Sequence, residues 1–329
     1  MPQAPEPTTS RLTPAVRPEQ RPTPLVSVVM AAKNYARFLP AAVESVLAQT
    51  VADWELLVID DGSTDATPAA VRPYLTDARV RYVHSDRLGQ SRAKNLGIGL
   101  SRGRYVAFLD ADDAWRPTKL EKQLALFHDD VGVVFCRRSL MDEQGTALPQ
   151  KPTPAPPTGR VLTPIFVQNF VCFSSVVVRR EVFSAVGAFD PQWDLAIDYD
   201  LWLRVARAFG FDFVDEELVA YRTGHGNLSK KLADRVATAL SIMHRAETRY
   251  AIGGTVPAKV IAAGYASTCR TLAYVIRAAE PLASARWCAR ALRWPDARLA
   301  SAKGLAAALV AWAKGRREAG AAENATANV

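Results

Sequence analysis

The chain has 329 residues, of which 49% are hydrophobic and 22% charged, so it can form one large domain or two ordinary ones around a sizeable core. Its net charge of +8 is uneven: Lys+Arg and Asp+Glu balance at 27 each over residues 25–250, whereas 11 against 4 leaves +7 on residues 251–329. The longest apolar candidate, residues 304–313, falls short of the roughly 18 residues that a membrane-spanning helix needs, so a transmembrane protein is not expected.

The N-terminal segment and the cysteines point to an ordinary cytoplasmic protein. Residues 1–24 are rich in Pro, Thr, Gln and Arg and lack the apolar centre of a signal peptide, so we expect a disordered leader. The four cysteines show no CxxC or other metal-ligand spacing, which predicts reduced, inert thiols.

Two interpretations suit the basic C-terminal part, residues 251–329. Positive helices can bind anionic lipid at the inner face of the membrane, or an acidic partner, and they can equally be solvated surface. Nucleic acid is not expected as a partner, because no binding motif and no interleaved aromatic residues accompany the charge.

The first half of the chain alternates between two patterns. Apolar runs without strict alternation predict buried strands at residues 25–31, 54–59, 80–84, 104–109 and 131–136. Helical spacing of apolar residues lies between them, at residues 38–49, 65–75, 90–101 and 117–127. This alternation predicts βαβ units in an α/β fold with a mainly parallel, Rossmann-like sheet flanked by helices.

Beyond a Pro-rich loop at residues 151–158, the pattern completes this domain and then changes. We expect helices at 160–170, 181–186 and 198–208, and strands at 173–178 and within 211–221. From about residue 231 the chain is Ala- and Arg-rich and helical, with Pro257, Pro281 and Pro295 as boundaries. The predicted organisation is a leader (1–24), an α/β domain (25–230) and a helical accessory region (231–329).

Asp110-Ala111-Asp112 follows the strand predicted at 104–109. Two carboxylates one residue apart can share Mg²⁺ or Mn²⁺, which prefer oxygen ligands and complete their coordination with substrate phosphates. Such an ion would neutralise a leaving diphosphate. The alternative is an Asp-rich turn that caps the next helix.

A second acidic cluster, Asp60 to Asp65 (DDGSTD), follows the strand at 54–59. Gly62 permits a tight turn, and an aspartate there can accept a hydrogen bond from a base N–H. The alternative is an ordinary loop with Ser63 or Asp65 as helix cap. Because ligands bind beyond the carboxyl ends of strands in open α/β sheets, we expect both clusters to face one crevice.

Two further motifs carry chemistry near the end of the domain. Asp198-Tyr199-Asp200 opens a helix, where a carboxylate can deprotonate an acceptor hydroxyl or simply cap the helix. In the stretch YRTGHGNLS after the last strand, Arg222 and His225 can contact phosphate or metal, although a loop histidine is often only solvated.

Taken together and in this order, the stretches VSVVMAAKNYARFLPAAVESVLAQTVADWELLVIDDGSTD, GQSRAKNLGIGLSRGRYVAFLDADDAW, GAFDPQWDLAIDYDLWLR and YRTGHGNLS resemble glycosyltransferase family 2, with its GT-A fold, over about residues 25–229. The resemblance implies a metal-dependent, inverting enzyme that moves a sugar from a nucleotide-diphosphate donor, with UDP-sugar expected, to an acceptor hydroxyl. By family analogy, the acceptor is a glycan, lipid-linked or protein acceptor in the assembly of bacterial surface polysaccharide, glycolipid or glycoprotein.

The resemblance also implies roles for individual residues. The donor would contact Ala31, Ala32, Asn34, Asp61, Arg92, Asn95, Asp110 and Arg222. The metal ion, Mn²⁺ or Mg²⁺, would be held by Asp112 and His225. Asp198 matches the family's catalytic base, and Asp200 is the alternative for that role.

Two other classes of protein share some of these features. A nucleotide-sugar-binding protein without turnover remains an alternative, although the intact DxD and Asp198 argue against it. An NAD-dependent oxidoreductase would need GxGxxG between the first strand and the first helix, and residues 31–38 contain no glycine.

Overall fold

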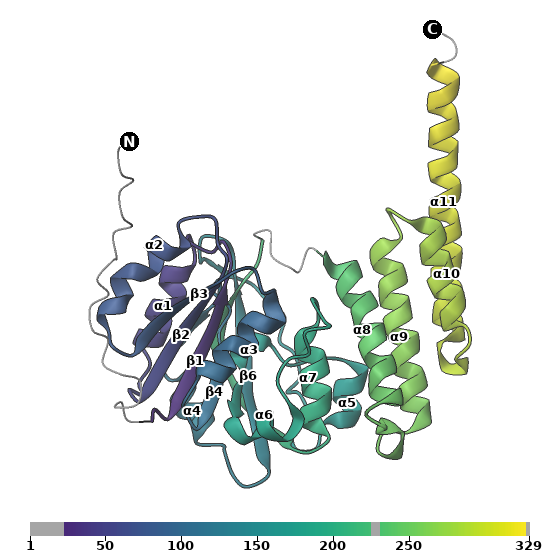
Figure 1. Ribbon diagram of the computed structural model, residues 1–329. Coiled ribbons are helices and arrows are strands. Elements are labelled where there is room, and N and C mark those ends of the chain that lie inside the picture. The colour runs from purple at the N-terminus through teal and green to yellow at the C-terminus, as the bar shows by residue number, and fades with distance from the viewer. Residues whose placement is uncertain (1–22, 225–230, 327–329) are drawn as a thin grey trace, which may run out of the picture.

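The structure is a computed structural model that describes residues 23–224 and 231–326. The leader expected at residues 1–24 lies almost entirely outside the described residues. Figure 1 shows an α/β domain with a row of C-terminal helices packed along one side, and the last helix extends away from the rest.

The sheet is built around four parallel strands. β1 (Val26–Ala32) pairs with β2 (Trp54–Asp61) on one side and with β4 (Tyr105–Phe108) on the other, and β3 (Val80–Ser85) lies beyond β2. Every residue of β2 and β4 is buried, which explains their continuous apolar sequence. The carboxyl ends of all four strands therefore lie along one edge of the sheet.

Beyond β4 the sheet becomes mixed, in the order β3-β2-β1-β4-β8-β6-β9-β5. β8 (Val177–Arg179) is antiparallel to β4 and to β6 (Val131–Met141), while β9 (Gly210–Arg222) runs parallel to β6. β5 (Ala114–Trp115) pairs with β9, and β7 (Ala147–Leu148) pairs with β6. The antiparallel pairings are short and the long ones are parallel, which confirms the predicted fold class.

Helices cover both faces of the sheet. Their bounds are α1 (Leu39–Leu47), α2 (Thr67–Val71), α3 (Gln90–Leu100), α4 (Lys119–Leu124), α5 (Leu162–Val167), α6 (Arg180–Val186) and α7 (Ile197–Ala206). One core contains buried residues of α1, α2 and α4, and the other contains those of α3, α5, α6 and α7. Alternate residues of the central strands enter the two cores, as expected for a sheet between two helical layers.

Two predicted elements differ from the structure for local reasons. The strand expected at 173–178 begins as a 3₁₀ turn (Phe173–Ser175), because the Ser175 hydroxyl donates to the Cys172 carbonyl 2.6 Å away. The helix expected at 65–75 changes to a 3₁₀ helix (Arg72–Thr76) after α2, where Pro73 cannot donate a helical hydrogen bond.

The C-terminal helices are α8 (Leu232–Thr248), α9 (Ala258–Ile276), α10 (Pro281–Ala291) and α11 (Arg298–Thr326). α8 packs against α7 and α9, and α9 packs against α5. Ile242, Met243, Ala246 and Ile261 belong to the same core as α5 and α7. The first two helices of this region therefore share the core of the α/β domain.

The cysteines and the lengths of the helices agree with what the sequence predicts. Cys136, Cys172, Cys269 and Cys288 are all free thiols. Within the described residues, every helix is too short or too polar to pass through a lipid bilayer.

Candidate active site

The carboxyl end of β2 carries two buried aspartates with different hydrogen-bond partners. Asp60 is fully buried and accepts hydrogen bonds from the Tyr82 hydroxyl at 2.5 Å and the Ser63 amide at 2.8 Å. Asp61, the last residue of β2, accepts from the amides of Leu88 at 2.5 Å and Gly89 at 3.1 Å. Asp61 thereby fixes the loop that leads into α3.

The segment after β1 is tied to the same place. Ala32 is paired in register with Asp60, and Ala31 precedes it in β1. Asn34 has a left-handed backbone with φ 60°, and its side-chain oxygen accepts a hydrogen bond from the Thr64 amide at 2.8 Å. The structure therefore brings the predicted nucleotide-site residues Ala31, Ala32 and Asn34 next to the loop after Asp61.

The first turns of α3 carry Lys94, which contacts the end of β4 and which the sequence reasoning missed. Lys94 is buried, and its ammonium group donates to Asp110 at 3.1 Å and to Gln90 at 3.3 Å while lying 3.8 Å from the centre of the Phe173 ring. The i, i+4 spacing of Gln90 and Lys94 places both on one side of the helix. The spacing of this polar pair is the feature of the sequence that could have identified Lys94 as a site residue.

The two α3 residues that were predicted to approach the donor differ in accessibility. Arg92 is exposed. Asn95 uses its whole amide on the backbone of Phe189, donating to its carbonyl at 2.7 Å and accepting from its amide at 2.9 Å. Asn95 thus fastens α3 to the segment before α7, and donor contact through this amide would break that fastening.

The loop after β4 holds a dense group of carboxylates. The side chain of Asp110 is 35% exposed, whereas Asp112 and Asp113 are buried. Asp113 accepts hydrogen bonds from the Ser174 hydroxyl at 2.5 Å and the Arg222 amide at 2.8 Å. Burial, and then the charges of Asp112 and Asp110, raise the pKa of the Asp113 carboxyl well above its ordinary value.

The pKa of Tyr35 is affected by the negative charges of this loop. Tyr35 follows β1, and its pKa is raised by burial and then by the charges of Asp112, Asp110 and Asp113. The loops after β1 and β4 therefore lie close together, and the space between them has a negative potential.

Arg222 occupies a different place from the one predicted. Its guanidinium donates to the carbonyls of Asp112 at 2.8 Å, Asp142 at 3.0 Å and Glu143 at 2.9 Å, and it lies over the Phe38 ring. These bonds hold the DxD loop in shape, where the sequence predicted contact with donor phosphate. His225, the second predicted metal ligand, lies outside the described residues.

The start of α7 also pairs an open carboxylate with an enclosed one. Asp198 is half-buried and accepts a hydrogen bond from the Asn169 amide at 2.8 Å. Asp200 is fully buried between Arg204, at 2.9 Å, and the Tyr250 hydroxyl, at 2.7 Å. An enclosed carboxylate with these partners cannot reach an acceptor, so the structure argues against Asp200 as the alternative base.

Contacts between loops bring α7 to the same edge of the sheet. The Ser91 hydroxyl donates to the Trp193 carbonyl at 2.7 Å, and Gln90 donates to the Asp194 carbonyl at 3.3 Å. The first turn of α3 therefore touches the segment that leads into α7, and the same helix reaches Asp110 through Lys94. The polar surface around this turn of α3 therefore joins the ends of β2 and β4 to the segment before α7.

The metal-binding capacity of this surface is limited to few protein ligands. Among the described residues, no group of three or more His, Cys, Asp or Glu side chains is arranged to hold a metal ion. Mg²⁺ and Mn²⁺ commonly bind through one or two carboxylates plus substrate phosphates. Asp110, which also accepts from Lys94, and Asp112 fit that pattern, because the carboxylates gathered in this loop would attract a cation.

A mainly parallel sheet between two helical layers, with an Asp-Ala-Asp loop at its carboxyl edge, is the arrangement expected of a GT-A glycosyltransferase. Residues 27–187 match the family model described as Glycosyl transferase family 2. The chain therefore contains a glycosyltransferase family 2 domain over these residues.

Curated relatives agree with this class. The chain is 34% identical to an uncharacterised glycosyltransferase of Nostoc sp. over 61% of its own length and 65% of the relative. It is 39% identical to the putative teichuronic acid biosynthesis glycosyltransferase TuaG of Bacillus subtilis, over 38% of this chain and 51% of that one. The chain thus spans less than two thirds of the length of either relative.

Solved structures share the fold at low sequence identity. The mannosyltransferase PcManGT of Pyrobaculum calidifontis, in complex with GDP-Man and Mn²⁺, matches with a TM-score of 0.59 and 19% identity over 87% of this chain and 86% of that one. S. aureus TarS 1-349, in complex with UDP-GlcNAc, matches with a TM-score of 0.52 and 14% identity over 88% and 92%.

Proposed function

We propose that this glycosyltransferase is metal-dependent and inverting, and that it transfers a sugar from a nucleotide-diphosphate donor to an acceptor hydroxyl. The observation that carries the proposal is the set of contacts by which α3 and the loop before it link Asp61, Asp110 and the segment that leads to Asp198. The linked parts match the needs of the reaction: a site for the nucleotide, carboxylates for a cation, and an accessible base.

In this proposal the nucleotide lies across the ends of β1 and β2. The small side chains of Ala31 and Ala32 lie at the end of β1 beside Asp61, whose carboxylate would use a remaining lone pair to accept a hydrogen bond from a base N–H. UDP is the expected nucleotide; GDP is the other candidate, because the solved neighbours were captured with UDP-GlcNAc and with GDP-Man.

Asp110 and Asp112 would hold Mn²⁺ or Mg²⁺ together with the donor diphosphate. The ion, when bound, neutralises negative charge on the leaving nucleotide diphosphate. Lys94 adds a buried cation beside Asp110 and fixes the direction of that carboxylate. Arg222 keeps the loop folded from behind through three backbone carbonyls.

Asp198 would act as the general base. It is half-buried at the start of α7, and the Asn169 amide fixes its orientation by donating to Oδ2. Removal of the acceptor proton by Asp198 lets the acceptor oxygen attack the anomeric carbon from the face opposite to the leaving phosphate, which inverts the centre.

The proposal extends to the acceptor and to the cellular location of the enzyme. The likeness to a glycosyltransferase named for teichuronic acid biosynthesis supports a surface polysaccharide, glycolipid or glycoprotein as the product. Four free cysteines favour a reducing, cytoplasmic compartment. The charge of +7 on residues 251–329 supports peripheral contact with anionic lipid at the inner face of the membrane.

The test is a thermal-shift screen of UDP-, GDP-, dTDP- and CMP-sugars with and without Mn²⁺. One donor is expected to raise Tm only when the ion is present, because the cation bridges protein carboxylates and diphosphate. Asp112→Asn should abolish that shift, while Asp129→Asn, an exposed aspartate on the loop before β6, should preserve it. An unchanged shift in Asp112→Asn contradicts the metal assignment.

Turnover separates the enzyme from the second candidate, a nucleotide-sugar-binding protein. Release of free nucleotide from the stabilising donor, measured with Mn²⁺ present, is expected for a transferase because water can replace the acceptor slowly. Donor binding without any release, in the presence of a range of acceptor glycans, would favour the binding protein.

A further inference from the structure

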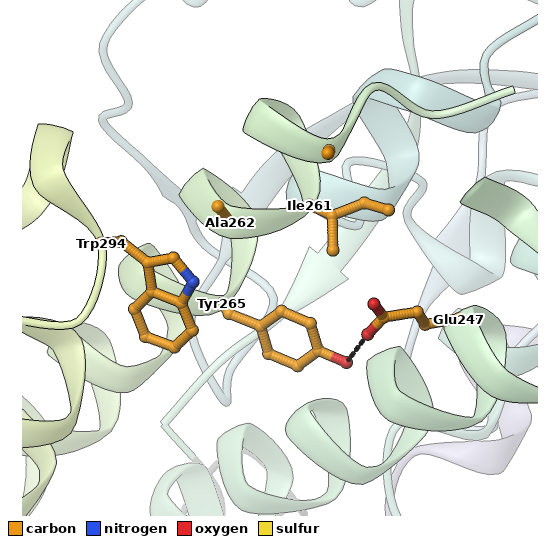
Figure 2. A pocket seen from close by; sticks show the side chains of 6 residues that line it. Glu247, Ile261, Ala262, Tyr265 and Trp294 are labelled. Carbon is orange, nitrogen blue, oxygen red and sulfur yellow. Dashed lines mark hydrogen bonds between the residues drawn. The ribbon is translucent and has the colours of Figure 1, made fainter. Parts of the chain in front are cut away.

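A small surface pocket lies in the helical region, outside the polar surface of the proposed reaction. Its volume is about 320 Å³, and it lies where the end of α8, the start of α9 and the turn after α10 meet. Figure 2 shows its lining: Glu247, Ala258, Ile261, Ala262, Tyr265 and Trp294. The volume is at the lower end of the roughly 300–1,000 Å³ typical of small-ligand sites.

Two aromatic rings give this pocket a flat wall. The planes of Tyr265 and Trp294 are within 4° of parallel, and their centres are 6.0 Å apart. Figure 2 shows both rings nearly face-on and displaced sideways, so the pair is parallel and offset. Phe166 contacts Tyr265 edge-on at 6.2 Å and is itself fully buried, which anchors that ring to the protein core.

A carboxylate stands at the end of this wall. The Tyr265 hydroxyl donates to Glu247 Oε2 at 3.1 Å, which joins α9 to α8 and fixes the position of the acid (Figure 2). Glu247 is exposed, and within the described part of the chain its other carboxylate oxygen has no hydrogen-bond partner. The pocket therefore offers a flat apolar face and a charged acceptor that can receive hydroxyl groups.

We infer that this pocket is a carbohydrate-binding site that holds one pyranose unit of a glycan. One face of a pyranose presents C–H groups, which pack on aromatic rings, and its rim presents hydroxyl donors, which suit Glu247. Neutral sugar is the ligand class that satisfies both the flat wall and the acid.

The position of the pocket indicates which part of a glycan it would hold. Glu247 is in the last turn of α8, and the Tyr250 hydroxyl just beyond that turn donates to Asp200 of α7 at 2.7 Å. The pocket is lined by residues of α8, α9 and the turn after α10, and by none of the aspartates of the proposed reaction. It would bind a remote unit of a long acceptor or product, and this last step rests on the proposed function.

The experiment measures binding directly, by saturation-transfer-difference NMR and calorimetry on the full chain without donor. The ligands are maltotetraose, cellotetraose, β-1,4-mannotetraose and N-acetylchitotetraose. We expect at least one to bind, and Trp294→Ala and Tyr265→Ala each to weaken that binding at least tenfold. Trp294→Phe keeps a flat ring and should retain it within threefold.

A matched control comes from the same helical region. Trp287 lies on α10 outside the pocket, beneath the Arg290 guanidinium, so Trp287→Ala should leave glycan binding unchanged. Binding of none of the four glycans, equal loss in Trp287→Ala and Trp294→Ala, or preferential binding of UMP to this pocket would each overturn the inference. Because donor is absent, glycan binding can succeed even where the donor screen fails, which separates this site from the proposed function.

Discussion

The loop after β4 and the start of α7 arrange their aspartates in a similar way. Each presents aspartates close together in sequence, and each holds one of them between protein partners: Asp113 between Ser174 and Arg222, and Asp200 between Arg204 and Tyr250. Asp110 and Asp198 are the more accessible carboxylates of the two regions. An acidic motif at a site can therefore combine a structural carboxylate with a reactive one, and the hydrogen-bond partners of each carboxylate help to distinguish them.

The largest effect on catalysis is expected from substitution of Asp198, the more accessible aspartate of α7. Asp198→Asn is expected to lower kcat at least about 100-fold, the usual contribution of a general base, and to leave donor affinity within threefold. Steady-state transfer assays with donor-binding calorimetry measure both. Asp194→Asn, an exposed aspartate just before α7, is the matched control. Loss of donor affinity in Asp198→Asn would contradict the base assignment.

Substitution of Asp200, the enclosed aspartate of α7, should lower stability more than catalysis. Asp200→Asn is expected to cost about 3 kcal/mol of folding free energy, because it leaves the largely buried Arg204 without its counter-charge. Tm measured by calorimetry should fall by roughly 5–10 °C. The kcat of the folded enzyme should stay within an order of magnitude, and a loss as large as that of Asp198→Asn would abolish the distinction between the two aspartates.

A smaller effect should follow from loosening the accessible carboxylate without removing it. Asn169→Ala deletes the amide that donates to Asp198 and should lower kcat about tenfold, the equivalent of one hydrogen bond to a charged group. KM for the donor should not change, because Asn169 acts through Asp198. Gln168→Ala alters the exposed neighbouring residue and serves as control. Equal kinetics for the two variants would mean that Asn169 does not position the base.

Much of the fold could be predicted from sequence because the central strands are buried on both faces and their apolar runs are unbroken. The ends of those runs also located Asp61 and Asp110, since a parallel sheet puts its carboxyl ends at one edge. In contrast, the short strands β5 and β7 escaped prediction, because a two-residue strand carries no periodic signal.

The partners of the charged groups could not be predicted. Asp113 and Ser174 are 61 positions apart, and Arg222 meets the Asp112 carbonyl across 110 positions, so no local pattern relates them. The difference between Asp198 and Asp200 depends on Tyr250, which belongs to the helical region. Side-chain pairing over such distances is a property of tertiary packing and leaves no trace in local periodicity.

The shared core of α5, α7, α8 and α9 has a consequence for how such enzymes exchange parts. A chimera that replaced everything after residue 230 would remove Ile242, Met243 and Ile261 from that core, and would also remove the Tyr250 hydroxyl from Asp200. A tolerated junction is expected instead between α9 and α10, near residues 277–280, where the chain leaves the core. Grafting of new C-terminal modules onto this scaffold should therefore keep the first two accessory helices with the catalytic unit.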